Sequence, residues 1–325
     1  MLGAICGDIV GSRHEFNPLK ITDFELFHED CRATDDTVLS FAVLQWLLDQ
    51  TPIEDCLVDW TLAHVNAGYG LHFLEWALKP DRAPYGSLGN GGAMRVSPVG
   101  WLGGQGLADV ARLAAETAAP THGHHHGTRG AKAVAVAVRM ALEGWSKEEV
   151  AAVLADRFGY DLSRRTGDIR PRYCFEVAAH RSVPEALICA LEADSWEGAV
   201  RLAVSLGGDA DTQACIAGAV AEALYGLPGE AAAAGEARLP PEMRDMLARF
   251  RAEAAGRAWP RTDPGRIDRD RAPERDGPDP FSTEHMMAQM AKLERLAAAA
   301  TAPRAPSLWG RLRRLARRAA AGGRR

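Results

Sequence analysis

The chain has 325 residues, and its 47% hydrophobic and 25% charged residues are the balance of a soluble globular protein. This composition excludes a wholly disordered, collagen-like or fibrous chain. Aromatic residues make up only 7% of the chain while alanine is abundant, which favours closely packed helices over a β-sandwich.

The cysteines and the apolar runs indicate the compartment in which we expect the chain. None of the six cysteines forms a CxxC pair, so we expect reduced thiols in a cytoplasmic protein. The N-terminus lacks a basic segment ahead of an apolar run, which argues against a secretory signal. No uninterrupted apolar stretch reaches the roughly 18 residues of a membrane span, so we expect no transmembrane segment.

The formal net charge of −5 is spread unevenly and divides the chain. Residues 304–325 carry eight arginines and no acid, and residues 257–303 are neutral, which leaves −13 on the first 256 residues. We therefore predict an acidic domain at 1–256 and a helical tail at 283–325. Between them, residues 257–282 are dense in Pro, Gly, Asp and Arg without apolar periodicity, which is typical of a flexible linker.

A glycine stripe marks the first predicted helix. Gly3, Gly7 and Gly11 recur every four residues, so one face of this helix is bare and a second helix can approach it closely. Asp8 lies within this apolar stretch and needs a partner there. Glu15 follows where we expect the helix to end.

Helical patterns dominate the rest of the acidic domain. Residues 21–27 alternate briefly between apolar and polar and are the best strand candidate. Residues 38–48 are apolar almost all round and predict a buried central helix. Apolar residues at three-to-four spacing predict further helices up to the Ala- and Gly-rich segment 214–226. Together these patterns predict one all-α domain.

An acidic motif, Thr34-Asp35-Asp36, directly precedes the predicted central helix. Thr34 is typical of an N-cap, and two carboxylates in a first turn stabilise the helix dipole, so simple capping explains the motif by itself. However, two carboxylates that open a fully apolar helix lie close to the core. A carboxylate there is costly unless it is paired or bound to a metal.

A second acidic motif, Asp209-Ala210-Asp211-Thr212, follows two glycines and opens another predicted helix. A calcium loop is the alternative, but the further oxygen ligands and the closing Glu of an EF-hand are missing. Two Asp/Asp/Thr motifs at helix N-termini suggest one shared site, and all-oxygen ligands favour Mg²⁺ or Mn²⁺ over zinc. Four carboxylates are enough for two ions.

A glycine-rich turn lies between the two acidic motifs. Residues 87–95 read Ser-Leu-Gly-Asn-Gly-Gly-Ala-Met-Arg and run into a predicted helix. Such a turn offers free backbone N–H groups to an anion, typically a phosphate. It matches neither a P-loop nor GxGxxG, and a plain turn is the alternative.

The motifs in combination resemble the ADP-ribosylglycohydrolase family over about residues 1–255. Each motif is weak by itself, and their common order along the chain is the strong evidence. The five segments are GDIVGSRHE (7–15), TDDT (34–37), GNGGAMRVSP (89–98), TH (121–122) and GGDADTQACIAGAVAEALYG (207–226).

This resemblance implies an all-α fold around a centre of two Mg²⁺ or Mn²⁺ ions. The metal ligands that it implies are Thr34, Asp35, Asp36, Asp209, Asp211 and Thr212. The carboxylates that it implies in catalysis are Glu15, Asp35, Asp36 and Asp209. The residues that it implies around the ribose and the diphosphate are Gly70, Gly89, Asn90, Gly91, Gly92, Ala93, Met94 and His122. Tyr85 is a looser match, to an aromatic residue that stacks on adenine.

The activity implied is hydrolysis of the ribosyl C1″ bond of an ADP-ribosylated protein, nucleic acid or small molecule, with a water activated at the metal site. The alternative is a catalytically inactive module that binds ADP-ribose. The presence of all six expected ligands together with Glu15 favours activity. A metal phosphohydrolase is a third hypothesis, but we find no clear nucleophile or His–Asp dyad for it.

Two segments depart from the family pattern. Residues 122–126 read His-Gly-His-His-His, for which we expect an exposed loop, with a zinc or copper site as the alternative. Residues 307–320 place leucines on one face and arginines largely opposite. This predicts a basic amphipathic helix suited to an anionic surface, an acidic partner or nucleic acid. A frayed, solvated chain end is the alternative, since so short a helix is marginal in water.

Overall fold

The computed structural model describes residues 1–270. The predicted tail and the predicted linker from residue 271 onward lie outside the described residues. No helix within residues 1–270 has the length and apolar character needed to cross a membrane.

The described residues form an α-helical fold, as predicted, and contain no β-strand. Gly89 and Ala178 form an isolated antiparallel bridge. The strand expected at 21–27 is wrong, because these residues form bends and irregular loop. The helices in chain order are α1 (Leu2–Gly11), α2 (Asp35–Asp49), α3 (Ile53–Ala63), α4 (Leu71–Ala77), α5 (Gly91–Met94), α6 (Ser97–Leu102), α7 (Leu107–His122), α8 (His125–Leu142), α9 (Lys147–Phe158), α10 (Thr166–Ile169), α11 (Ala179–Glu192), α12 (Trp196–Ser205), α13 (Ala210–Tyr225), α14 (Gly229–Glu236), α15 (Pro241–Ala254) and the 3₁₀ turn η1 (Pro264–Arg266).

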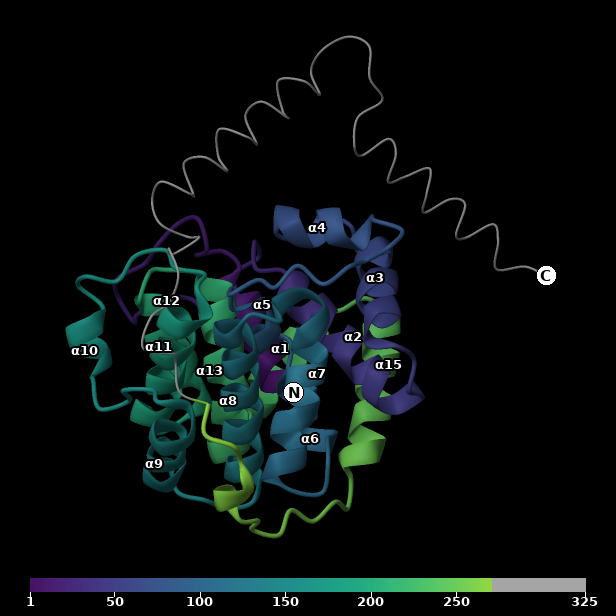
Figure 1. Cartoon of the computed structure of the whole chain (residues 1–325). Coiled ribbons are helices and arrows are strands. Elements are labelled where there is room, and N and C mark those ends of the chain that lie inside the picture. Colours follow the sequence, from purple (N-terminus) through teal and green to yellow (C-terminus); the bar gives the residue numbers. More distant parts are fainter. Residues whose placement is uncertain (271–325) are drawn as a thin grey trace. The chain divides into compact units, whose positions relative to one another are not determined.

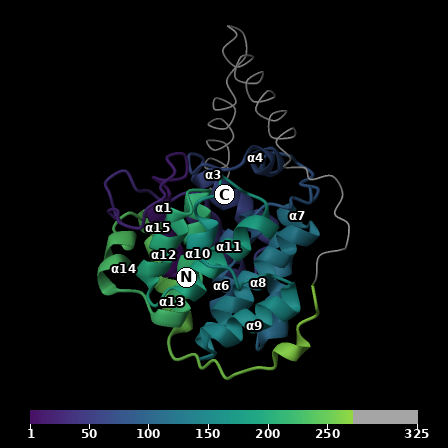
Figure 2. The ribbon, with the colours of Figure 1, turned by 90° about the vertical axis from the view of Figure 1, so that its left-hand side faces the viewer.

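Two buried helices, α1 and α13, form the centre of the fold. Every residue of α1 is buried, and α13 is buried from Ala210 to Ala221. Helices α8, α11 and α12 pack around α13, and the turned view shows α11 and α12 side by side (Figure 2). Helix α2 contacts α3, α6 and α15 on the other side of the centre (Figure 1). Helix α2 also contacts α1 and α13, so it reaches the centre of the fold.

The glycine stripe explains how closely α1 and α13 pack. A Cβ atom at Gly7 would overlap the carbonyl group of Ala214, and one at Gly11 would overlap that of Ala210. The predicted bare face is thus the contact face with α13. Because both helices are rich in small residues, their backbones meet without intervening side chains, as the composition indicated.

The packed structure continues beyond residue 256, where the sequence predicts the start of a linker. In the strap formed by residues 257–270, the Trp259 indole donates to the Trp101 carbonyl at 3.2 Å. Thr262 donates from its N–H and its hydroxyl to the Glu143 carboxylate, each at 2.9 Å, and Ile267 is buried. The sequence of the strap has no helical periodicity, so its composition by itself predicts a linker.

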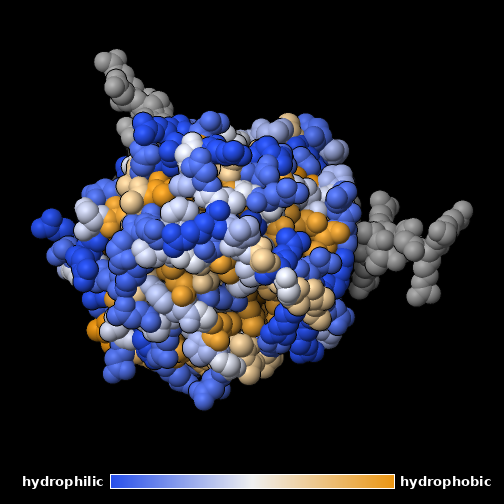
Figure 3. All heavy atoms as spheres, turned by 90° about the horizontal axis from the view of Figure 1, so that it is seen from below, coloured by the Kyte–Doolittle hydropathy of each residue, from blue (hydrophilic) through white to orange (hydrophobic). Residues whose placement is uncertain are grey.

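The strap crosses the lower edge of the fold as seen in Figure 1. The surface seen from below shows hydrophilic residues broken by small apolar patches (Figure 3). Scattered apolar groups of this kind are ordinary for a folded domain and need no partner.

Gly7→Ala should destabilise the protein through the α1–α13 contact. The added methyl group meets backbone, which cannot move aside, so we expect a loss of about 3 kcal/mol or more in the free energy of unfolding. Gly229→Ala is the matched control, since Gly229 begins α14 and its Cβ would meet nothing within 4 Å. We expect that control to be neutral or slightly stabilising in urea unfolding. Equal unfolding midpoints for the two variants would contradict this packing.

Candidate metal and substrate site

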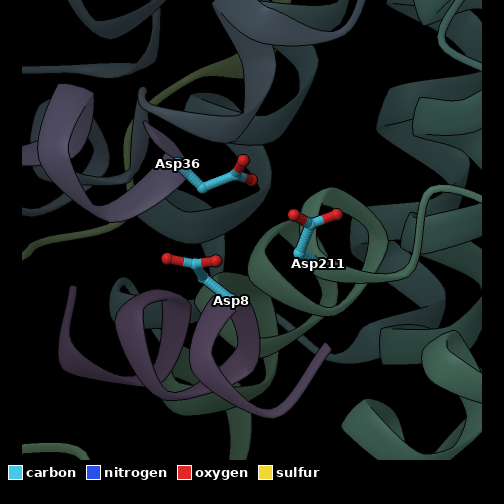
Figure 4. A group of neighbouring side chains, drawn as sticks. All are labelled: Asp8, Asp36 and Asp211. Atoms are coloured by element: carbon cyan, nitrogen blue, oxygen red, sulfur yellow. The ribbon is translucent and has the colours of Figure 1, made fainter. Parts of the chain in front are cut away.

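Three carboxylates from three helices meet where α1, α2 and α13 converge. Asp8 lies on α1, Asp36 in the first turn of α2 and Asp211 in the first turn of α13, and their side chains point toward one another (Figure 4). Each offers an oxygen within 4.8 Å of the others. Glu15, Asp209 and Asp211 form a second group by the same measure, so Asp211 belongs to both.

Asp8 ties the start of α2 to α1. Its carboxylate accepts hydrogen bonds from the Thr34 hydroxyl at 2.6 Å and the Thr34 N–H at 3.0 Å. It also accepts from the Thr37 N–H at 3.1 Å and from the Thr37 hydroxyl. The Thr34 oxygen in turn accepts from the Asp36 N–H at 3.3 Å, as the predicted N-cap. The sequence indicated that Asp8 needs a partner, but it did not place Asp8 in the site.

The second acidic motif is joined to both the first motif and the glycine-rich turn. The Asn90 amide donates to Asp209 at 2.7 Å. The Thr212 hydroxyl donates to Asp36 at 3.3 Å, and the Thr212 N–H donates to Asp211 at 3.0 Å. The structure thus brings together acidic residues that lie more than 170 positions apart in the chain.

Asp35 lies beside the two carboxylate groups but in neither of them. It is the first residue of α2, and its backbone N–H donates to the Ala67 carbonyl at 2.9 Å. A Cβ atom on Gly68 would lie 3.7 Å from the Asp35 carboxylate. Gly70 follows at the N-cap of α4, with open space where a side chain would be.

Burial raises the pKa values of these acids, and their mutual charge adds to the effect. The pKa values of Asp35, Asp36 and Asp211 lie well above the ordinary range, because of burial first and neighbouring carboxylates second. Burial raises the pKa of Asp209 to about 6, and burial with the charge of Asp211 raises that of Glu15 to about 8. None of them forms an ion pair with a basic residue within residues 1–270.

The chemistry of this donor set fits hard divalent cations. Every donor is an oxygen, and one oxygen of Asp36 is buried without a hydrogen-bond partner. Several carboxylates buried together are stable only if protons or cations balance their negative charge. Two carboxylate groups that share one member fit two neighbouring ions.

The glycine-rich turn lies against His122 at the end of α7. A Cβ atom at Gly91 would stand 2.6 Å from Nε2 of His122, so the ring covers the turn at this point. The Asn90 N–H donates to the Val177 carbonyl at 2.8 Å, which anchors the turn from the other side. Gly92, Ala93 and Met94 follow in α5, with the Met94 sulfur 3.8 Å from the Thr212 hydroxyl. The predicted phosphate turn and the predicted metal ligands are therefore neighbours.

A cavity of about 210 Å³ lies at Tyr85, which shortly precedes the glycine-rich turn in the chain. It is lined by His72, Glu75, Trp76, Lys79, Ala83 and Tyr85. The Tyr85 ring lies 6.4 Å from that of His122, and burial raises the Tyr85 pKa to about 12. Sequence reasoning found Tyr85 but not the cavity, whose lining residues carry no recognisable motif.

The exposed loop expected at 122–126 is wrong. His125 begins α8, and His126 is buried and stacked on His180 at 4.1 Å between ring centroids. His122 is also buried, at the end of α7. The groups within residues 1–270 that could hold a metal ion do not include these histidines. His122 and His126 pack inward because two helices meet here with only Gly123 and His124 between them.

Comparisons with known proteins point to one family. The sequence model of the ADP-ribosylglycohydrolase family matches residues 1–266. The chain is 28% identical to human ADP-ribosylhydrolase ARH3 in an alignment that covers 70% of this chain and 84% of the human protein. Mouse ARH3 is 29% identical, with 70% and 83% covered. A solved structure of an ADP-ribosylglycohydrolase-related protein complex superposes with a TM-score of 0.59 at 26% identity, covering 78% of this chain and 94% of that one.

Asp211→Asn removes one charge from both carboxylate groups at almost constant volume. We expect it to raise the melting temperature of EDTA-treated protein, because it relieves the repulsion. We also expect it to remove most of the rise in melting temperature that Mg²⁺ or Mn²⁺ causes in the native chain. For a domain of this size, each kcal/mol of stabilisation raises the melting temperature by about 2–4 °C. Asp161→Asn, at an exposed position, is the control and should keep the cation response. An undiminished response in Asp211→Asn, measured by scanning fluorimetry, would count against the cation site.

The raised pKa values also predict how stability depends on pH. In the folded state these acids hold protons that the unfolded chain releases from about pH 4 upward. Stability therefore falls as pH rises from about 4 to the folded-state pKa values, of which that of Glu15 is about 8. We expect metal-free protein to melt at a lower temperature at about pH 8 than at about pH 5.5, and added cation to narrow the gap. A higher melting temperature at about pH 8 than at about pH 5.5 would show that folding does not raise the pKa values of these acids.

Proposed function

Since this chain belongs to the ADP-ribosylglycohydrolase family and is an ADP-ribosyl hydrolase, we propose that it hydrolyses the C1″ ribosyl bond with the help of two Mg²⁺ or Mn²⁺ ions. The observation that carries the proposal is the pair of carboxylate groups sharing Asp211, beside the glycine-rich turn and His122. The substrate is an ADP-ribosylated protein, nucleic acid or small molecule, and the product is ADP-ribose.

The residues that would hold the ions follow from the two groups. Asp8, Asp36 and Asp211 would hold one ion, and Glu15, Asp209 and Asp211 the other. The hydroxyls of Thr34 and Thr212 stand beside these carboxylates as further oxygen donors. When bound, the ions supply positive charge that can order the vicinal ribose hydroxyls and acidify a water.

The chain's own carboxylates supply the proton chemistry. Asp35 stands outside both groups, so its oxygens are not needed to hold the ions. Bound cations would lower its pKa, which burial raises, and the carboxylate could then accept the proton of an attacking water. Glu15 is only partly buried and lies on the loop after α1, where it can face the scissile bond. The surrounding negative charge stabilises the positive charge that develops on the ribose as the C1″ bond breaks.

The remaining contacts orient the rest of the substrate. The backbone N–H groups of Gly91 and Gly92 at the start of α5, together with His122, would hold the diphosphate, since the N–H groups of Gly89 and Asn90 already donate to Ser87 and Val177. The neighbouring cavity at Tyr85 would take the adenine ring, which stacks well on an aromatic side chain.

The predicted tail helix lies outside the described residues, and its contact with an anionic surface or an acidic partner stays a prediction.

A panel of defined ADP-ribosylated arginine, serine, aspartate and DNA substrates tests this function. We expect release of ADP-ribose from at least one substrate with Mg²⁺ or Mn²⁺, and loss of release with EDTA. Asp36→Asn should lower kcat/KM by about 10²-fold or more through loss of the site. Asp161→Asn is the control and should match the native chain. Full turnover in EDTA would exclude the metal-assisted mechanism, and tight ADP-ribose binding without turnover on any substrate would indicate a binding module instead.

A further inference from the structure

A buried arginine stands behind His122 without entering the cluster of carboxylates. Arg95 follows α5 and is wholly inaccessible to solvent. Its Nη2 donates one hydrogen to the Thr117 carbonyl at 2.7 Å and the other to the Thr121 hydroxyl oxygen at 2.8 Å. Nε and Nη1 are buried without a hydrogen-bond partner, and no carboxylate within residues 1–270 forms an ion pair with this guanidinium.

The number of hydrogen atoms on Arg95, Thr121 and His122 decides the direction of the hydrogen bonds between them. The Thr121 oxygen lies 2.8 Å from Nδ1 of His122. A guanidinium only donates, so the single proton of the Thr121 hydroxyl cannot point back to Arg95. The acceptor that remains for this proton is Nδ1 of His122. Nδ1 is then the bare nitrogen of the imidazole, and Nε2 carries the proton.

The surroundings also keep His122 neutral. Burial, and after it the charge of Arg95, lowers the pKa of His122 well below its ordinary value. A neutral ring has one N–H, so its position decides what the ring can bind. The Nε2 edge faces the glycine-rich turn, since a Cβ atom at Gly91 would stand 2.6 Å from it. An N–H at Nε2 therefore points to the place where the proposed function puts a phosphate.

We propose that Arg95 is a positioning residue that sets the tautomer of His122 through the Thr121 hydroxyl, so that Nε2–H donates to a substrate phosphate. The inference rests on the proposed binding of the diphosphate at the glycine-rich turn. With the opposite tautomer, Nε2 would present a lone pair to the phosphate oxygens and repel them. The hydrogen bonds from Arg95 through Thr121 thus place a donor at this position, which binds a phosphate oxygen without a charged side chain in contact with it.

The first measurement is ¹⁵N NMR of the native chain with labelled histidine, with the His122 signal assigned through its loss in His122→Gln. We expect Nδ1 to be unprotonated and Nε2 protonated around neutral pH. In Thr121→Val, which keeps the shape but lacks the hydroxyl, we expect a mixture of tautomers. Thr121→Ser restores the hydroxyl and should restore the single tautomer. A protonated Nδ1 in the native chain would overturn the proposal.

The second measurement is calorimetric titration with ADP-ribose. Thr121→Val should weaken binding roughly tenfold, the loss of about one hydrogen bond to a charged group, while Thr121→Ser should stay close to the native value. Arg95→Met should weaken it by a similar factor, and the double variant should be no weaker than either single one, because both act through His122. Additive losses, or a native affinity in Thr121→Val, would overturn the proposal.

The two proposals can fail separately. If the native chain shows the expected tautomer but neither binds ADP-ribose nor releases it from any substrate, the proposed function fails and the phosphate role of His122 fails with it. If the native chain binds and hydrolyses as proposed while the NMR signal shows protonated Nδ1, the function stands and the role of Arg95 is rejected. Thermal unfolding of each variant, compared with that of Thr121→Ser, separates loss of fold from loss of the donor chain.

Discussion

The close approach of α1 and α13 is the constraint on which the site depends. Because Gly7 and Gly11 have no side chains, the two backbones touch, and the residues beside the stripe come within reach of the start of α13. Asp8 thereby meets Asp211, although the two lie on helices from opposite ends of the domain. A larger residue on the stripe would separate the carboxylates as well as the helices.

The same contact creates an electrostatic cost. Asp8, Asp36 and Asp211 are buried together, and the hydrogen bonds from Thr34 and Thr37 satisfy only part of the Asp8 charge. A domain selected for stability alone would not gather acids in its centre, since each raised pKa reports free energy that is lost at neutral pH. The arrangement is explained by the cations that we propose to bind there and by the chemistry they support.

Around this centre the proposed substrate contacts come from other parts of the chain. Asn90 joins the glycine-rich turn to Asp209, which ties the proposed phosphate contact to the proposed metal site. Arg95 and Thr121 sit behind His122 and set the direction of its N–H. The site is therefore held in place by hydrogen bonds between segments that are distant in the chain, and this limits how far it can shift when substrate binds.

The sequence by itself determined the all-α class and the acidic motifs, because helical periodicity and helix N-terminal residues are local properties. It also indicated the bare face of α1, since glycines at a spacing of four must line up on a helix. Only the tertiary structure decided that Asp8 joins Asp36 and Asp211, that His126 is buried and that the strap at 257–270 packs against the helices. Each of these depends on contacts between distant segments, which local spacing does not encode. The direction of the His122 proton likewise follows from Arg95, which lies in the motif at 89–98 but whose contact with Thr121 no local spacing encodes.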